Sequence, residues 1–277
     1  MTLPPQDPPS DAADGALPVS GGWLDAVRLA FGTLTVLPAG VPSRVDRVVG
    51  GRAMVLAPVV GVVIGGVAAG VIALAQLVKP DADLLAAVLG VLVIAALSGG
   101  LHLDGLADFA DALGSRRDRE TMLRIMKQSD IGPFGVVAIV GVLLLDVAAL
   151  TACIQFGYGW QAILIATTAS RLTLPWSCRT SVPAARPDGL GTFVAGTVRP
   201  LTATIATTVV LAAALALTWP SPSRLAGSAA AVLLAVATSF ATTRRARTAL
   251  GGTTGDVLGA TIELALPLTL LALALAA

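Results

Sequence analysis

Residues 53–78, AMVLAPVVGVVIGGVAAGVIALAQLV, form an apolar run that carries no charged side chain. A helix needs about 20 apolar residues to cross the hydrocarbon core of a bilayer, so this run predicts a transmembrane helix. Comparable runs follow along the chain at 84–101, 133–154, 160–178, 201–219, 224–241 and 257–276. We therefore predict an all-α integral membrane protein, a polytopic bundle of about seven transmembrane helices.

The composition excludes a soluble globular domain, because 55% of the 277 residues are hydrophobic, 13% are charged and the mean hydropathy is +0.84. The bilayer is the expected partner, and nucleic acid is not. Residues 1–20 are rich in Pro and Asp and predict a disordered tail. Residues 21–277 then form one polytopic catalytic domain. Within it, WLDAVRLAFGTLTVLP at 23–38 is amphipathic and short, which predicts an N-terminal interfacial or re-entrant helix.

Basic residues concentrate in alternate loops between the predicted spans. One set of loops holds Arg44, Arg47, Arg52, Arg116, Arg117, Arg119, Arg124, Lys127, Arg179, Arg186, Arg199, Arg244, Arg245 and Arg247. The loops of the opposite face hold only Lys79 and Arg224. Because loops rich in Lys and Arg stay in the cytoplasm, we predict a multi-pass protein of the inner cell membrane whose basic face is cytoplasmic.

The segment LHLDGLADFADALGS at 101–115 carries three carboxylates and the single histidine of the chain. Asp104, Asp108 and Asp111 are spaced i, i+4, i+7, which places them on one face of a helix. Like charges on one face repel each other, and a divalent cation would compensate them. Mg²⁺ prefers oxygen ligands and is typically bound through carboxylates and substrate phosphates. The pattern predicts a Mg²⁺ site, and a solvated helix end is the alternative.

A second polar segment, GGTTGDVLGATIEL at 251–264, falls on the same predicted face. Its glycines allow close backbone approach, and the start of the last helix would direct N–H groups at an anion. Asp256 and Glu263 lie two turns apart on one helix face, and Glu263 is inside a predicted span, where an ionisable group indicates function. Packing of a glycine-rich helix start remains the alternative.

Three further residues are candidates for the site. His102 precedes the carboxylate stripe, with a chemical role or a positioning role both open. Arg171 and Asp146 lie inside predicted spans and either pair with each other or, for Arg171, contact a phosphate. The loop arginines Arg179, Arg186 and Arg199 suit an anionic substrate but are equally explained by topology.

The motifs GGLHLDGLADFADALGS, RDRETMLRIMKQSDIGPFGV and LGGTTGDVLGATIEL closely resemble those of the cobalamin synthase family, the adenosylcobinamide-GDP ribazoletransferases. The resemblance extends over nearly the whole chain after the tail. It implies a Mg²⁺-dependent phosphotransferase of cobalamin biosynthesis, with adenosylcobinamide-GDP and α-ribazole, or its 5′-phosphate, as substrates. A ribose hydroxyl of the acceptor would attack the cobinamide-linked phosphate and expel GMP. A homo-oligomer is left open.

The expected site follows from the residue pattern and the resemblance together. The expected metal ligands are Asp104, Asp108, Asp111, Asp256 and Glu263. The expected catalytic residues are Asp111, Asp108 and His102. The expected substrate-binding residues are Gly251, Gly252, Thr253, Thr254, Gly255, Arg171 and Lys127.

The chain departs from the family pattern at Val36, where many members have Arg, and at Thr253, where many have Gln. A contact made by either family residue is therefore in doubt here. Two other functions compete with the resemblance. A CDP-alcohol phosphotransferase also places aspartates along helix ends, but its motif matches only partly. A cation-coupled transporter would use Asp146 and Glu263, whereas most carboxylates here lie at one membrane face.

Overall fold

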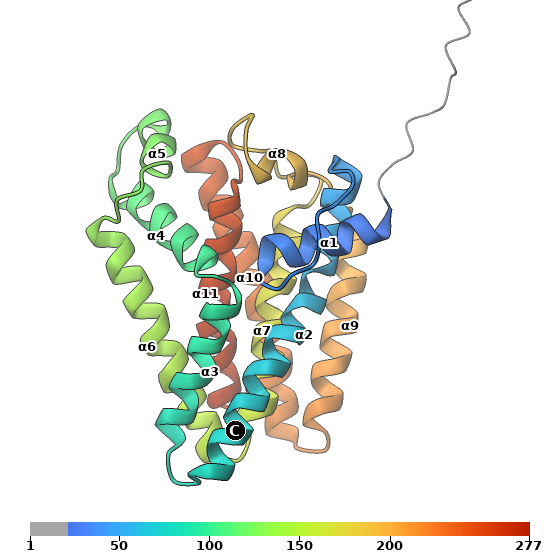
Figure 1. Cartoon of the computed structure of the whole chain (residues 1–277), viewed down its shortest axis with the longest axis vertical. Helices are drawn as coiled ribbons and strands as arrows, with labels where there is room; N and C mark the ends of the chain where they lie inside the picture. Colours follow the sequence, from blue (N-terminus) through green and yellow to red (C-terminus); the bar gives the residue numbers. More distant parts are fainter. Residues whose placement is uncertain (1–21) are drawn as a thin grey trace, which may run out of the picture.

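The chain folds into a bundle of helices that stand roughly parallel (Figure 1). The computed structural model describes residues 22–277, and the predicted disordered tail lies outside them. The helices are α1 (Trp23–Leu34), α2 (Arg47–Val78), α3 (Asp83–Leu97), α4 (Leu101–Gly114), α5 (Arg119–Ile125), α6 (Pro133–Gln155), α7 (Gly159–Ser177), α8 (Leu190–Val194), α9 (Pro200–Thr218), α10 (Pro222–Leu250) and α11 (Gly255–Ala274). The described residues contain no strand beyond two isolated bridges, so the predicted all-α fold is confirmed.

Five of the helices are long and apolar enough to cross a membrane, namely α2, α6, α9, α10 and α11. The pair of α3 and α4 makes a sixth candidate, bent by 86° at its break. Every predicted span therefore corresponds to a helix, but α7 does not qualify by its own apolarity. Its polar side chains, among them Thr167, Ser170 and Arg171, are buried inside the bundle, which explains how so polar a helix is accommodated.

The predicted single span at 84–101 is wrong in one respect, because the helix stops at Leu97. Gly99 and Gly100 both adopt positive φ, +62° and +70°, a conformation that glycine enters without steric cost. The chain then restarts as α4 in a new direction. The break turns α4, the helix that carries the three aspartates, away from the axis of α3 and across one end of the bundle (Figure 1).

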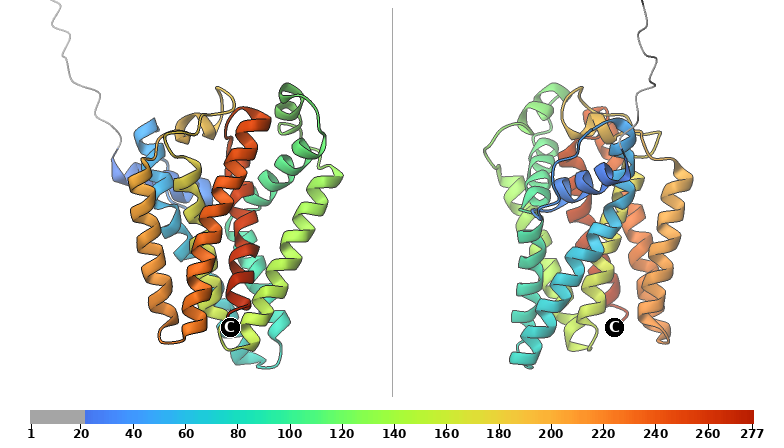
Figure 2. Two further views of the ribbon diagram at one scale, coloured as in Figure 1. Left: turned by 180° about the vertical axis from the view of Figure 1, so that it is seen from behind. Right: turned by 45° about the vertical axis from the view of Figure 1, so that its right-hand side comes forward.

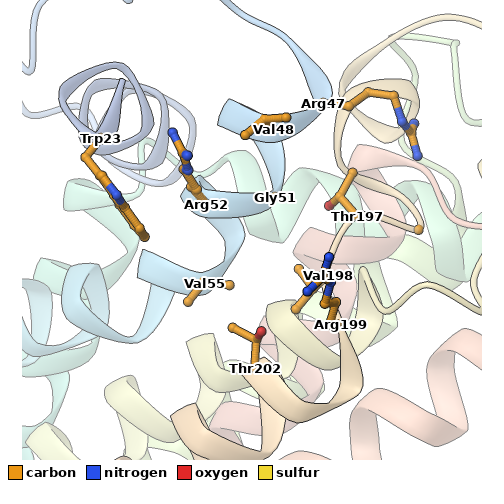
Figure 3. Close-up of a pocket in the computed structure, with 11 residues that line it drawn as sticks. Trp23, Arg47, Val48, Gly51, Arg52, Val55, Thr197, Val198, Arg199 and Thr202 are labelled. Carbon is orange, nitrogen blue, oxygen red and sulfur yellow. The ribbon is translucent and has the colours of Figure 1, made fainter. Parts of the chain in front are cut away.

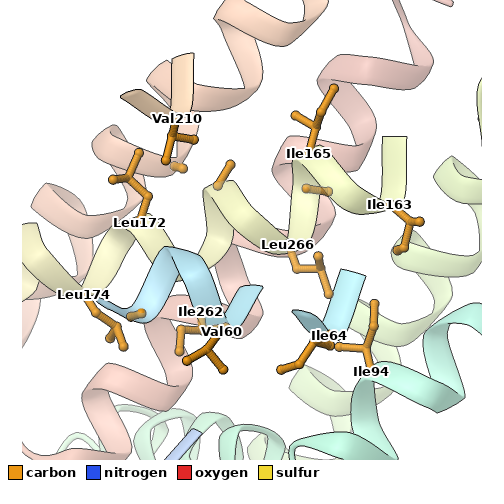
Figure 4. Packing of buried hydrophobic residues seen from close by; sticks show 14 of the residues in the cluster. Val60, Ile64, Ile94, Ile163, Ile165, Leu172, Leu174, Val210, Ile262 and Leu266 are labelled. Atoms are coloured by element: carbon orange, nitrogen blue, oxygen red, sulfur yellow. The ribbon is translucent and has the colours of Figure 1, made fainter. Parts of the chain in front are cut away.

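The core of the bundle is α7, which packs against α2, α6, α9, α10 and α11. Apolar side chains from these helices interlock around it, including Leu172 of α7, Ile64 of α2 and Ile262 of α11 (Figure 4). Small residues such as Ala166 and Ala169 bring the helix backbones close, as is common in membrane bundles. The core fixes α11, and α11 in turn positions the site.

The N-terminal helix α1 lies across the upright helices near one end of the bundle, as predicted for an interfacial element (Figure 2). Its Asp25 is buried and accepts hydrogen bonds from the backbone N–H and hydroxyl of Ser43, at 2.8 and 2.9 Å. These bonds lower the pKa of the Asp25 carboxyl. The same carboxylate therefore ties α1 to the segment that leads into α2.

Candidate active site

The two polar segments meet where α4 crosses α11. Two glycines allow the close approach: a carbon added to Gly105 of α4 would lie 2.8 Å from the backbone oxygen of Asp256, and one added to Gly259 of α11 would lie 3.1 Å from Cα of His102. Any larger residue at Gly105 would push the helices apart. Residues far apart in sequence therefore share one site.

This crossing gathers three carboxylates, those of Asp104 and Asp108 on α4 and of Asp256 on α11. Asp104 is exposed, whereas Asp108 and Asp256 are partly buried. Asp108 lies within electrostatic reach of both others, and Asp104 also acts on Asp256. No hydrogen-bond donor among residues 22–277 reaches the carboxylate of Asp104 or Asp108. The cluster is therefore a concentration of negative charge whose α4 members are free to take up a cation.

Arg186, from the long loop after α7, brings a positive charge to this cluster. Its Nη2 lies 3.4 Å from Oδ2 of Asp256 and its Nε lies 3.6 Å from Oδ1 of Asp188. Lys127 in turn donates a hydrogen bond of 2.7 Å to Asp188, which lowers the pKa of the Asp188 carboxyl. Sequence reasoning noted Arg186 only as one of three loop arginines, because nothing local distinguishes it from Arg179 or Arg199.

Asp111, the third member of the stripe, faces a different partner. Its Oδ2 accepts the backbone N–H of Gly132 at 2.7 Å, and its Oδ1 accepts that of Gly135 at 2.9 Å. These groups are at the N-terminus of α6, where the first N–H groups have no partner within the helix. Asp111 therefore caps α6 from a neighbouring helix.

The glycine-rich segment joins α10 to α11 and packs against the long loop. Gly251 ends α10 with a positive φ of +80°. Gly252 lies so close to the backbone of Pro183 and Ala184 that a side chain would not fit. Thr253 exchanges backbone hydrogen bonds with the same loop, and the hydroxyl of Thr254 caps Val257 of α11. Gly252, Thr253 and Thr254 are buried, so these contacts give the segment a structural role.

A pocket of about 280 Å³ opens beside the carboxylates. Its polar groups are Asp256, His102 and Thr33, and its walls are mainly apolar, with Leu190 of α8 and Leu101 of α4 among them. His102 is 4% exposed, and within the described residues neither of its ring nitrogens has a hydrogen-bond partner. A small molecule with an uncharged, apolar part fits these walls.

Behind the pocket, three charged residues are buried inside the bundle, namely Arg171, Glu263 and Asp146. His102 Nδ1 is 3.8 Å from Oε1 of Glu263, and Arg171, which is fully buried, lies within electrostatic reach of Glu263 and Asp146. The guanidinium of Arg171 also donates to the hydroxyl of Ser170 at 2.9 Å. The structure thus places Arg171 among acidic residues inside the bundle and Glu263 beside His102 rather than beside the three carboxylates.

The five expected metal ligands do not form one group. Among residues 22–277, no three Asp, Glu, His or Cys side chains are close enough together to hold a metal ion as they stand. The chemistry of Asp104, Asp108 and Asp256 nevertheless fits Mg²⁺, because these carboxylates supply oxygen ligands and repel one another without a cation.

The helical bundle with its candidate spans, and the carboxylate cluster beside a pocket at its basic end, define a polytopic membrane protein with a polar site at one face. The sequence pattern of the family described as Cobalamin-5-phosphate synthase matches residues 26–274. The chain belongs to this family, which confirms the resemblance and leaves the two competing functions without support.

Curated relatives agree with this family. A protein of Frankia casuarinae named adenosylcobinamide-GDP ribazoletransferase is 42% identical over 260 residues, covering 90% of this chain and 94% of its own. Proteins with the same name are 39% identical in a Nocardioides species, covering 90% and 97%, and 40% identical in Pseudomonas aeruginosa, covering 91% and 98%. No solved structure matches the chain. The similarity to these transferases thus covers nearly the whole chain.

Proposed function

We propose that this protein is an adenosylcobinamide-GDP ribazoletransferase that works at the basic, cytoplasmic face of the inner membrane. A ribose hydroxyl of α-ribazole, or of its 5′-phosphate, attacks the phosphate attached to cobinamide, and the bond to GMP breaks. The observation that carries the proposal is the α4–α11 crossing, which puts Asp104 and Asp108 beside Asp256 and the pocket. Family membership supports the same reaction.

The donor's diphosphate lies, in this proposal, at the three carboxylates and Arg186. The side chain of Arg186 is only 18% exposed and its guanidinium already lies beside Asp256, so it contributes positive charge with little solvent screening. Lys127 and Asp188 hold the loop that carries Arg186 in place. Lys127 therefore supports substrate binding through Asp188.

The acceptor's base lies in the apolar pocket, where its uncharged aromatic ring replaces water against Leu190 and Leu101. This position brings the ribose toward Asp256 at the polar end of the pocket. His102 is buried and its ring nitrogens have no hydrogen-bond partner within the described residues, so it is available to hydrogen-bond the acceptor. We assign removal of the hydroxyl proton to Asp108. Its carboxylate is partly buried, accepts no hydrogen bond within the described residues, and interacts electrostatically with both Asp104 and Asp256.

Asp104, Asp108 and Asp256 are the residues that would hold Mg²⁺. When bound, Mg²⁺ neutralises charge on the transferred phosphate and the leaving group. Asp111 and Glu263 are left out of this set because their contacts are to the α6 N-terminus and to His102. Side chains of the protein orient the substrates, accept the hydroxyl proton and form the apolar wall of the pocket.

The test is GMP release by purified protein in proteoliposomes, with Asp118→Asn as the matched control. Asp118 is an exposed aspartate that caps α5 and has no part in the cluster. We expect Asp108→Asn to lower turnover by about 10²- to 10⁴-fold, since it removes a proton acceptor. Asp104→Asn should shift the Mg²⁺ concentration needed for half-maximal rate upward.

Near-normal turnover and Mg²⁺ dependence in both variants would remove the carboxylate assignment. Release of a nucleotide other than GMP by the unmodified protein would remove the proposed reaction itself.

A further inference from the structure

A second cavity, of about 600 Å³, lies on the basic face at the start of α2 and α9 (Figure 3). Three arginines line it, Arg47 and Arg52 of α2 and Arg199 just before α9. No acidic side chain is among its lining residues. The cavity shares no lining residue with the pocket beside the carboxylates. Its charge therefore suits an anion.

The arginines are held in position by their surroundings. The guanidinium of Arg47 donates to the backbone oxygens of Thr192 and Ala195, at 2.5 and 2.7 Å. That of Arg52 lies over the ring of Trp23, 5.1 Å from its centre. Arg199 occupies the N-cap of α9, so the positive end of that helix adds to its charge. A phosphate entering here meets a positive wall that is already ordered.

The cavity extends along two helices that are candidate membrane spans, α2 and α9. Its lining includes Thr202 in the first turn of α9 and Val55, about two turns into α2. Only 22% of the apolar stretch of α9 is buried, so most of that helix surface is turned outward, to where acyl chains lie. Trp23, at the rim, is 58% exposed, as expected for a tryptophan at the membrane interface.

From this arrangement we propose that the cavity binds the headgroup phosphate of an anionic phospholipid, with its acyl chains along α2 and α9. The ligand is a lipid rather than the substrate's diphosphate because α8 separates the two sites. On one side, Phe193 and Val194 of α8 lie against Gly50 of α2. On the other, Gly191 of α8 lies against Thr253 and Thr254.

The experiment measures lipid binding by the full-length protein. Phosphatidylcholine nanodiscs with and without phosphatidylglycerol are compared by native mass spectrometry of retained lipid and by melting temperature. The variant is the double substitution Arg52→Gln and Arg199→Gln. The matched control is Arg117→Gln with Arg245→Gln, which removes two charges from the same face outside the cavity.

We expect phosphatidylglycerol to bind the unmodified protein and the control alike, and the cavity variant to bind it at least tenfold more weakly. Equal loss in the control would overturn the proposal, since general surface charge would then explain the binding. Pyrophosphate that displaces the lipid from the unmodified protein, but not from the cavity variant, would also overturn it and assign the cavity to a soluble phosphate.

Should the double variant fail to fold, Thr202→Trp provides the second test, because it fills the cavity from α9 and leaves every arginine in place. Unchanged phosphatidylglycerol retention by a folded Thr202→Trp protein would contradict the proposal.

Discussion

Asp111 shows how one residue of a regular stripe takes a different task from its neighbours. The i, i+4, i+7 spacing predicted equivalent positions for the three aspartates of α4. In the structure, both carboxylate oxygens of Asp111 instead accept hydrogen bonds from the N-terminus of α6. Its partners come from a segment whose position relative to α4 depends on the whole bundle. Local periodicity therefore predicted the helix face but not the division of labour along it.

Replacement of Asp111 separates a capping role from a chemical one. Asp111→Asn should keep part of the stability, because its amide oxygen can accept one of the two backbone N–H groups but its NH2 cannot accept the other. Asp111→Ala should cost about 1 kcal/mol of stability and lower the melting temperature while folded protein retains turnover within tenfold. Melting curves and GMP release on the same samples provide the measurement. An Asp111→Asn protein that melts normally but loses as much activity as Asp108→Asn would give Asp111 a direct role in the reaction.

At the scale of elements, the crossing of α4 and α11 depends on Gly105. Gly105→Ala places a methyl group 2.8 Å from the backbone oxygen of Asp256, so the helices must separate. We expect a loss of about 1–3 kcal/mol of stability and at least a tenfold lower turnover, since small displacements of catalytic groups are costly.

The matched control is Gly141→Ala on α6, where an added carbon meets nothing within 4 Å. It should leave turnover unchanged, because alanine is the better helix former and no neighbour is displaced. Equal activity of the two alanine variants would mean that the crossing tolerates a shift and that the carboxylates do not need it.

The elements also differ in how far the sequence predicted them. Apolar length alone located the spans, because the bilayer sets a fixed requirement. The break after Leu97 was missed, although Gly99 and Gly100 are adjacent, since a glycine pair is equally common inside packed membrane helices. Arg186 and Gly252 gained their roles through contacts between distant segments, which no local pattern contains.

For the whole molecule, the distribution of charge predicts its orientation in the membrane. The ends of the helices that carry the fourteen basic loop residues all lie at one end of the bundle, together with α5 and α8 (Figure 1). The opposite end carries Lys79 and Arg224. The positive-inside rule then predicts that the carboxylate cluster faces the cytoplasm.

Labelling of single introduced cysteines tests this orientation. Ser129→Cys lies on the basic face and Asp81→Cys on the opposite one, both at exposed positions, while the native Cys153 and Cys178 are buried. We expect an impermeant maleimide to label Asp81→Cys in intact cells and Ser129→Cys only after the cells are opened. The reverse pattern would place the carboxylates outside the cytoplasm and exclude a supply of cytoplasmic substrate.

The buried charges of α7 have a consequence for how the protein is made. Arg171 lies within electrostatic reach of acidic residues on α6 and on α11, and α11 follows α7 only after α8, α9 and α10. A lone arginine in the middle of a helix is expensive to insert into lipid. During synthesis, Asp146 of α6 is made before Arg171 and can offset its charge, whereas Glu263 becomes available only when α11 emerges. Chains that stop before α11 would leave Arg171 with Asp146 alone, so we expect them to be less stable in the membrane than the full chain.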